Sequence, residues 1–369
     1  MYNVLTLNKI AACGTDLLDK SKYTVSDDEK NPDAILVRSA SMHEMELPGN
    51  LLAIARAGAG VNNIPIDKCT EKGVVVFNTP GANANAVKEL VIAGLLLSSR
   101  KIPAAMDWIK TLKGKGDEVG KLVEKGKSQF VGPEIMGKKL GVIGLGAIGI
   151  LVANAAAELG MDVYGADPYL SVENALKLSG KVHYVKSNKE IFEKCDYITL
   201  HVPALPDTKG MINAEAIASM KKTVRLLNFA RDTLVDEKAI IDALANGGMA
   251  CYVTDFATDG LIGLDGVVAM PHLGASTPES EDNCAVMAVR EIVDYIENGN
   301  IRNSVNLPNV EMAISGNAKI CVIHKNAEGL LNNITAPVSA AGLNIENMVS
   351  KSKKDYAYTC LLYTSDAAD

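Results

Sequence analysis

Short apolar runs alternate with helix-like segments along this chain, and this alternation constrains its fold more than any other feature. Between residues 139 and 272, six such runs are separated by segments with helical character. This pattern is typical of βαβ units, whose strands pair in parallel. This part of the chain is therefore predicted to form a complete doubly wound α/β domain. The six runs are KLGVIG (139–144), MDVYGADP (161–168), CDYITLHVP (195–203), TVRLLNFAR (223–231), ACYVTDF (250–256) and GVVAMPH (266–272).

The same alternation is found nearer the N-terminus. An almost wholly apolar helical pattern covers residues 85–101, and an amphipathic one covers residues 280–300 and ends at Gly299. The first ninety residues are therefore predicted to form further βαβ units with a parallel sheet. The N-terminal runs are DAILVRS (33–39), LLAIARAGAG (51–60) and GVVVFNTPGA (73–82).

The stretch GLGAIG (144–149) follows a predicted strand and opens a predicted helix. Gly144 permits a tight turn, Gly146 lets the backbone approach a pyrophosphate, and Gly149 allows close contact between helix and strand. The helix N-terminus adds unpaired N–H groups and a positive dipole end. Asp167 ends the next strand, where a carboxylate accepts hydrogen bonds from ribose hydroxyls and repels a 2′-phosphate. The arrangement predicts an NAD site, and a purely structural glycine turn is the alternative.

Composition excludes several classes of protein. The chain has 369 residues, of which 48% are hydrophobic and 22% charged, as in a globular protein of two or three domains. Its net charge of -7 argues against a nucleic-acid surface. No segment has the pattern of a secretion signal or a membrane span, and the seven cysteines lack the spacing of a metal site. We therefore expect a cytoplasmic protein without a metal, nucleic-acid or membrane partner.

Three titratable residues lie near the C-terminal ends of later predicted strands, where open α/β sheets bind their ligands. Arg231 can orient a substrate carboxylate, and His272 can exchange a proton near neutral pH. A carboxylate such as Asp259 stabilises a protonated histidine. Together they suit hydride transfer at an alcohol or ketone. Structural alternatives are an ion pair of Arg231 with Asp232 or Asp236, a turn at Asp259, and a structural histidine.

Four segments carry a likeness to a known family over nearly the whole chain: RAGAGVNNI (56–64), GKKLGVIGLGAIG (137–149), NFARDTLVDEKAI (228–240) and PHLGAST (271–277). They resemble the D-2-hydroxyacid dehydrogenases. The resemblance implies that Arg231 binds the substrate, that His272 is the acid/base, and that Asp259 is the partner of the histidine. The family usually has glutamate at the position of Asp259, and the shorter aspartate implies a looser or water-bridged pair.

The resemblance also implies a cofactor site and a substrate site. Asp255 is expected to contact the nicotinamide carboxamide. Lys127 matches a basic position that relatives present to a neighbouring subunit, and a solvated lysine is the alternative. The other residues expected to line the NAD site are Thr79, Gly144, Gly146, Ala147, Ile148, Gly149, Asp167, His201, Val202, Pro203, Phe229, Ala230 and Gly274. Those expected to bind the carboxylate or phosphate end of the substrate are Arg56, Ala57, Gly58, Ala59 and Gly60.

The last part of the chain reads as strand, helix, strand and the start of another strand. It resembles the ACT domain, a regulatory module that binds amino acids between paired copies. His324, Asn326 and Asn344 match positions that bind serine in some relatives, and capping or turn roles are the alternative. The sequence CLLYTSDAAD (360–369) stands where a complete module would need another helix and strand. We therefore expect a truncated ACT-like domain with an open sheet edge.

The resemblance implies a domain order. We expect residues 1–94 and 276–305 to form a flavodoxin-like α/β substrate-binding domain. Residues 95–275 are expected to form a doubly wound Rossmann NAD-binding domain inserted in it, and residues 306–369 the partial α+β ACT-like domain. Relatives pair through their cofactor domains, which implies a homodimer or homotetramer.

The resemblance also implies an activity, the NAD-dependent oxidation of 3-phosphoglycerate to 3-phosphohydroxypyruvate, which begins serine synthesis. Serine is then a candidate effector of the ACT-like domain. Another enzyme of the family, such as a glyoxylate or hydroxypyruvate reductase, is an alternative. A second alternative, of another class, is an NAD-sensing interaction protein without turnover.

Overall fold

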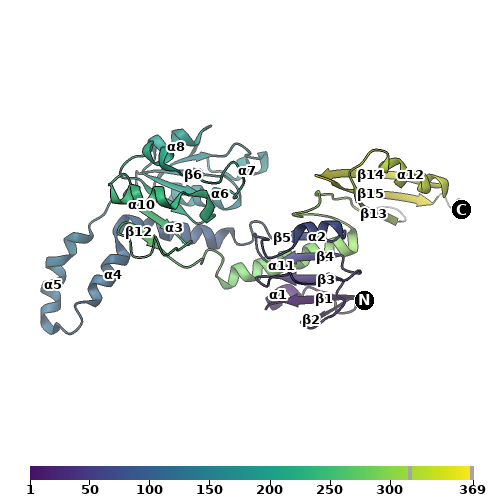
Figure 1. The fold of residues 1–369 in the computed structure, drawn as a ribbon, viewed down its shortest axis with the longest axis horizontal. Helices are drawn as coiled ribbons and strands as arrows, with labels where there is room; N and C mark the ends of the chain where they lie inside the picture. The colour runs from purple at the N-terminus through teal and green to yellow at the C-terminus, as the bar shows by residue number, and fades with distance from the viewer. Residues whose placement is uncertain (315–317, 366–369) are drawn as a thin grey trace. The chain divides into compact units, whose positions relative to one another are not determined.

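The computed structural model describes residues 1–314 and 318–365, and the chain forms two compact units (Figure 1). The first unit comprises Met1–Asn83 and Thr277–Asp369, and the second comprises Ala84–Ser276. The second unit is thus an insertion in the first. The chain passes between the units twice, after Asn83 and after Ser276.

The first unit contains a parallel sheet with two buried faces. In the described part of the chain this sheet has five strands in the order β2-β1-β3-β4-β5, the flavodoxin-like order that was predicted. All four residues of β3 are buried, as expected of a strand covered on both faces. The strand β2 lies at the edge and is mostly exposed, and neither β1 nor β2 was among the predicted runs. The bounds are β1 (Tyr2–Leu7), β2 (Tyr23–Ser26), β3 (Ala34–Val37), β4 (Ala53–Arg56) and β5 (Val75–Asn78).

Helices cover both faces of this sheet. On one face, Ala288 and Ile292 of α11 lie in one hydrophobic cluster with Leu36, and Cys69 of α2 lies in another cluster with Ile35. The helix α11 starts at Thr277, whose side chain accepts a hydrogen bond from the N–H of Ser280. It ends at Gly299 in the left-handed conformation, as predicted. The bounds are α1 (Ala12–Thr15), α2 (Ile66–Glu71) and α11 (Pro278–Asn298).

The second unit contains the predicted doubly wound sheet. All of its residues are described, and its seven strands pair in parallel in the order β12-β11-β10-β9-β6-β7-β8. This is the Rossmann order with one further strand, β12. The strand β8 was not predicted because its three residues are largely exposed and form no apolar run. The bounds are β6 (Lys139–Ile143), β7 (Asp162–Ala166), β8 (Val182–Tyr184), β9 (Tyr197–Leu200), β10 (Arg225–Asn228), β11 (Cys251–Thr254) and β12 (Val267–Ala269).

The helix α3 belongs entirely to the second unit, whereas the predicted boundary between residues 94 and 95 lies inside it. Its buried residues Val91 and Leu95 lie in one hydrophobic cluster with Leu227 and Phe229 of the second sheet, which is why the helix stays with that unit. No described helix is long and apolar enough to cross a bilayer. The helices of this unit are α3 (Ala84–Arg100), α4 (Ile102–Lys110), α5 (Val119–Gly126), α6 (Ala147–Glu158), α7 (Val172–Lys177), α8 (Asn188–Lys194), α9 (Ala214–Ala218) and α10 (Glu237–Ala245), with short 3-10 helices at Gly116–Glu118, Lys127–Phe130 and Asp232–Leu234.

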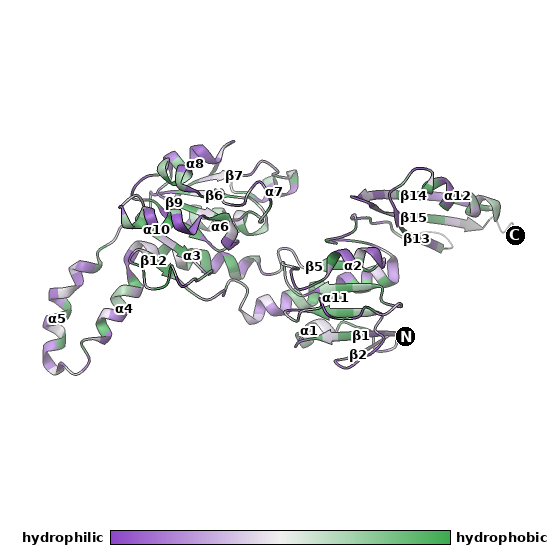
Figure 2. Cartoon of the chain, in the orientation of Figure 1, coloured by the Kyte–Doolittle hydropathy of each residue, from purple (hydrophilic) through white to green (hydrophobic). Residues whose placement is uncertain are grey.

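Helices α4 and α5 form an arm that extends from the body of the second unit (Figure 1). The rings of Trp108 and Phe130 lie 5.3 Å apart and join the two sides of the arm. Hydrophobic and hydrophilic residues alternate along both helices (Figure 2). Met106 and Ile109 are about half exposed, so the arm presents apolar side chains to its surroundings.

The small third sheet lies in the first unit. Its described strands pair antiparallel in the order β13-β15-β14, and α12 follows β13, so the strand-helix-strand reading is confirmed. The Tyr358 hydroxyl donates a hydrogen bond to the carbonyl of Gly299, at the end of α11. The bounds are β13 (Ala318–Lys325), α12 (Leu330–Ala340), β14 (Leu343–Lys353) and β15 (Tyr356–Ser365).

Substitution of two neighbouring leucines tests whether α3 is packed against the second unit through Leu95. Leu95 is fully buried, whereas Leu96 is 42% exposed. Leu95→Ala is expected to lower the free energy of unfolding of the second unit by about 2–5 kcal/mol, because it leaves a cavity. The matched control Leu96→Ala should change it by less than about 0.5 kcal/mol. The single tryptophan, Trp108, lies in this unit, so its fluorescence in a urea titration reports the unfolding. Equal effects of the two substitutions would contradict this packing.

Candidate active site

The carboxyl ends of the parallel strands of the second unit gather most of the predicted site residues at one edge of the sheet. Gly144 follows β6, Asp167 follows β7, His201 follows β9, Arg231 follows β10 and Asp255 follows β11. The strands β6 and β9 are neighbours, and the strand order reverses between them. Ligands of doubly wound sheets bind outside such a reversal point.

The glycine turn leaves an opening in front of α6. Gly144 has φ +95°, and a Cβ there would lie 2.5 Å from the carbonyl oxygen of His201. A Cβ on Gly149 would lie 1.9 Å from the carbonyl oxygen of Gly144, so helix and turn approach too closely for a side chain. At Gly146 a Cβ would meet no described atom within 4 Å, and no described side chain caps the helix there. The N–H groups of Ala147 and Ile148 in the first turn are thus open to an anion such as a pyrophosphate.

Asp167 connects the glycine turn to the end of β7. Its Oδ2 accepts a hydrogen bond from the N–H of Leu145 at 2.8 Å, and its Oδ1 accepts one from the N–H of Tyr169 at 2.8 Å. Each oxygen retains a lone pair that can accept from a ribose hydroxyl. The negative charge disfavours a 2′-phosphate. The residues present therefore fit NAD.

His201 forms part of the wall beside the glycine turn. Its Nε2 lies 3.0 Å from the hydroxyl of Thr199, and its backbone N–H donates to the carbonyl of Ile143 at 2.7 Å. Burial lowers the pKa of His201 to about 3, so the ring is neutral at physiological pH. The adjacent Val202 packs against Gly144, and the carbonyl of Pro203 accepts a hydrogen bond from the hydroxyl of Thr208. These residues border the glycine turn without adding charge to it.

Asp255 is a buried carboxyl at the end of β11. It is 3% exposed, and its carboxylate oxygens form no hydrogen bond of good geometry with the described residues, although the backbone N–H groups of Asp255 and Gly274 lie near enough to lower its pKa. Burial raises the pKa of Asp255, and the nearby positive charges of His272 and Arg231 oppose that rise. A Cβ on Gly274 would lie 3.6 Å from Oδ2, so the 271–274 segment passes directly beside this carboxyl. Asp255, His272 and Arg231 thus form one electrostatic cluster.

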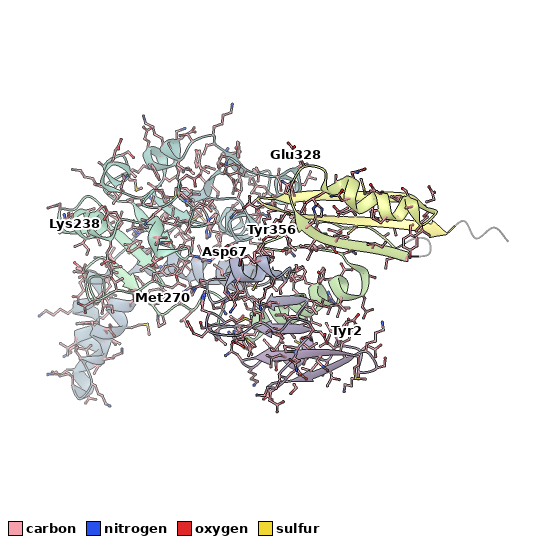
Figure 3. The ribbon with its side chains drawn as sticks, turned by 45° about the vertical axis from the view of Figure 1, so that its right-hand side comes forward. Tyr2, Asp67, Lys238, Met270, Glu328 and Tyr356 are labelled. Carbon is pink, nitrogen blue, oxygen red and sulfur yellow. The ribbon has the colours of Figure 1, made fainter. Side chains whose placement is uncertain are left out.

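His272 lies in the exposed segment that follows β12. Its ring meets the ring of Phe256 edge to face, with centroids 5.0 Å apart. Figure 3 labels Met270, two residues earlier, which locates this segment. The contact orients the imidazole while leaving it accessible to a substrate.

Arg231 is held by a turn that follows β10. Its Nη1 donates a hydrogen bond to the carbonyl of Ala230 at 2.6 Å, and the remaining guanidinium donors face solvent. Asn228, which is fully buried, donates from Nδ2 to the carbonyl of Arg231 at 2.8 Å and accepts at Oδ1 from the N–H of Ala230. Sequence reasoning missed Asn228. The feature that could have identified Asn228 in the sequence is a polar residue at the end of an apolar run.

Asp259 is on an exposed loop beyond β11. In residues 1–314 and 318–365, no ion pair or hydrogen bond joins Asp259 to His272. The same loop is tied to Glu237, whose Oε2 accepts a hydrogen bond from the hydroxyl of Thr258 at 2.9 Å. The structure instead places His272 near Asp255, where the positive charge of a protonated His272 lowers the pKa of that carboxyl.

The predicted substrate segment lies at the carboxyl end of β4 in the first unit. Nε of Arg56 donates to the carbonyl of Arg38 at 3.0 Å. The carbonyl of Ala59 accepts from Nδ2 of Asn78, and the N–H of Thr79 donates to the carbonyl of Gly58. The side-chain oxygen of Thr79 is fully buried and has no hydrogen-bond partner among the described residues.

Arg38, which sequence reasoning missed, follows β3 at the same edge of the sheet as Arg56. Its guanidinium pairs with Glu281 at 2.8 Å. Arg38 could have been identified from the sequence, because it is an arginine that directly follows an apolar run, as Arg56 does. Two guanidinium groups thus follow neighbouring strands of this sheet.

The remaining predicted residues lie outside the two parallel sheets, on the arm and in the small antiparallel sheet. Lys127 is on the arm, exposed, with Nζ 2.5 Å from Glu124 Oε2. His324 contacts the hydroxyl of Thr359 at 2.8 Å, and the N–H of Asn326 donates to the carbonyl of Asp355 at 2.8 Å, so both bond within the ACT-like sheet. Asn344 is exposed on β14.

The fold and the site define a class of protein, an oxidoreductase that binds a nicotinamide dinucleotide at a Rossmann sheet. The sequence matches the family model described as D-isomer specific 2-hydroxyacid dehydrogenase, NAD binding domain, over residues 92–274. D-3-phosphoglycerate dehydrogenase of Bacillus subtilis is 32% identical over 385 residues, which cover 98% of this chain and 70% of that protein. The protein of the same name from Methanocaldococcus jannaschii is 35% identical over 324 residues, covering 85% and 59%.

Solved structures agree. The crystal structure of NAD+-bound 3-phosphoglycerate dehydrogenase from Entamoeba histolytica matches with a TM-score of 0.65 and 27% identity, over 83% of this chain and 98% of that chain. The chain belongs to the D-isomer specific 2-hydroxyacid dehydrogenase family. The predictions of an NAD-dependent enzyme and of its cofactor are confirmed.

Two glycine substitutions distinguish the contribution of the turn to stability from its contribution to NADH binding. Gly146→Ala is expected to leave the melting temperature unchanged, because its methyl group meets no described atom. It should weaken NADH binding about 10-fold or more, because the methyl group obstructs the backbone donors of α6. Gly144→Ala should instead lower the melting temperature, because it strains the backbone and clashes with His201. NADH fluorescence titration and thermal unfolding measure the two effects. Full NADH affinity in Gly146→Ala would contradict the placement of the cofactor.

Proposed function

We propose that this chain catalyses the NAD-dependent oxidation of 3-phosphoglycerate to 3-phosphohydroxypyruvate. The observation that carries the reaction type is the cluster of Asp255, His272 and Arg231 at the carboxyl edge of the NAD-binding sheet. The substrate is supported by the names of the relatives and by Arg56 and Arg38, which follow neighbouring strands in the first unit. Two guanidinium groups suit a substrate with both a carboxylate and a phosphate.

Each residue of the proposed site has a separate role in the reaction. When held at the glycine turn, NAD would supply the acceptor for the hydride that leaves C2 of the hydroxy acid. Arg231 binds the substrate carboxylate through its free donors and polarises the C2 oxygen. His272, neutral at the start, takes the hydroxyl proton from that oxygen as the carbonyl forms. Asp255 then faces an imidazolium, whose positive charge offsets the cost of a buried carboxylate.

Two carboxyl groups compete for the role of partner to His272. Asp259 was expected from sequence, and Asp255 is the carboxyl whose pKa is lowered by the charge of His272. We assign the electrostatic role to Asp255, because it is buried and has no described hydrogen-bond partner, so its field is poorly screened. Asp259 then acts on loop conformation.

The arm suits the assembly that was expected from the family. Its exposed apolar residues Met106 and Ile109 would be covered in a homodimer or homotetramer, and Lys127 could then reach the site of a neighbouring subunit. Serine control through His324, Asn326 and Asn344 stays a prediction, as does a cytoplasmic location.

The proposed reaction is tested by NAD reduction with 3-phosphoglycerate. His272→Ala is expected to lower kcat by about 100- to 10,000-fold, because it removes the general base. Glycerate, which lacks the phosphate, is the matched substrate control and should show a much higher KM with the wild-type chain. Equal rates in wild type and variant would overturn the role of His272, and equal kcat/KM for both substrates would favour a reductase of small hydroxy acids. Tight NADH binding with no turnover of either substrate would favour an interaction protein.

Asp255→Asn and Asp259→Asn distinguish the two carboxyl groups. Asp255→Asn is expected to lower kcat/KM by about 100-fold, because the imidazolium loses its counter-charge. Because burial raises the pKa of Asp255, the wild-type rate should fall with decreasing pH before the usual aspartate range is reached, and this contribution should be missing in Asp255→Asn. Asp259→Asn should stay within about fivefold of wild type, as for an exposed charge. If Asp259→Asn lowered kcat/KM more than Asp255→Asn at every pH, Asp259 would be the partner of His272.

A further inference from the structure

The first unit contains a cavity of about 610 Å³ that the proposed reaction does not use. One wall is a single face of α11, formed by Asn283, Met287, Arg290, Glu291 and Asp294, which recur at helical spacing. The cavity is also lined by Gly81, Ala82, Asn300, Arg302 and Asn303. The volume lies in the range of small-molecule sites.

Glu291 is a buried carboxyl on the cavity wall. It is 8% exposed, and its Oε1 accepts a hydrogen bond from Nδ2 of Asn303 at 2.7 Å. Its Oε2 is buried without a hydrogen-bond partner among the described residues. Burial raises the pKa of Glu291 to about 8. Buried polar atoms are almost always paired, so Oε2 calls for a ligand atom that bonds to it.

Arg290 is the neighbouring residue on the same wall. It is exposed, and in residues 1–314 and 318–365 it forms neither an ion pair nor a hydrogen bond. The other lining arginine, Arg302, pairs with Glu311. The acidic Asp294 already accepts at Oδ1 from the side chains of Asn298 and Asn300. The cavity therefore offers one available guanidinium beside one unsatisfied carboxyl.

We propose that this cavity binds a small carboxylic acid that carries a hydrogen-bond donor on the adjacent carbon, that is, an α-amino or α-hydroxy acid. Its carboxylate binds the guanidinium of Arg290 through charge-assisted hydrogen bonds. Its amino or hydroxyl group donates to Oε2 of Glu291. At a pH above about 8, where Glu291 is ionised and Oε2 can only accept, a simple anion would leave Oε2 unpaired. A simple cation would leave Arg290 unused, so the titrations are made above this pH.

The site adjoins both segments that join the two units. Gly81 and Ala82 line it just before the first passage at Asn83, and α11 begins directly after the second passage at Ser276.

Calorimetric titration of the whole chain, without NAD or substrate, tests this site. The probes are glycine, glycolate, acetate and methylamine. Glycine or glycolate is expected to bind, and acetate and methylamine should bind about 10-fold more weakly or worse, because each lacks one of the two groups. Which of the first two binds identifies the donor as amino or hydroxyl.

Matched variants test whether the ligand binds in this cavity. Arg290→Gln and Glu291→Gln should each weaken it about 10-fold or more. Lys238→Gln, on α10 of the other unit and labelled in Figure 3, removes an exposed cation as control and should leave it unchanged. Glycolate is also titrated into Arg231→Gln, where binding at the proposed active site is weakened.

Three results would overturn the proposal: no binding of either glycine or glycolate, acetate binding as tightly as both, or undiminished binding in Arg290→Gln. Circular dichroism of Glu291→Gln confirms that its fold is retained. Arg290→Gln should bind NADH like wild type, so failure here is distinguishable from failure of the proposed reaction.

Discussion

The close approach of the turn after β6 to the end of β9 is the constraint on which the site depends. Because the carbonyl of His201 occupies the space of a Cβ at Gly144, the chain must turn there without a side chain. That turn starts α6 with its N–H groups facing open space, and Asp167 fixes the turn through the N–H of Leu145. The cofactor site is therefore a consequence of strand order and backbone packing more than of side-chain chemistry.

Among the residues that the structure describes, two buried carboxyl groups, Asp255 and Glu291, have oxygens without a hydrogen-bond partner, and both lie where a ligand could satisfy them. Asp255 faces the positive charges of His272 and Arg231, and Glu291 lies beside Arg290. Burying an unpaired carboxyl disfavours its charged form and costs stability. A fold that retains such groups gives up stability for function, as enzymes commonly do at their sites.

Much of the fold and of the cofactor site could be predicted from sequence, because both depend on local patterns. The apolar runs predicted the strands whose residues are buried on both faces, whereas the exposed strand β8 had no such signal. The glycine spacing predicted the turn at Gly144. The assignment of the whole of α3 to the second unit could not be predicted, because it depends on contacts with residues far away in the chain.

The sequence by itself determined the order of the strands and helices, the dinucleotide turn, and which residue types stand at the ends of the strands. Only the tertiary structure decided which of those residues meet: it buried Asp255 beside His272, left Asp259 on an exposed loop, and brought Glu291 and Asn303 together at a cavity. The physical reason is that spacing along the chain sets local conformation. Burial and electrostatic neighbours arise only when distant segments pack against each other.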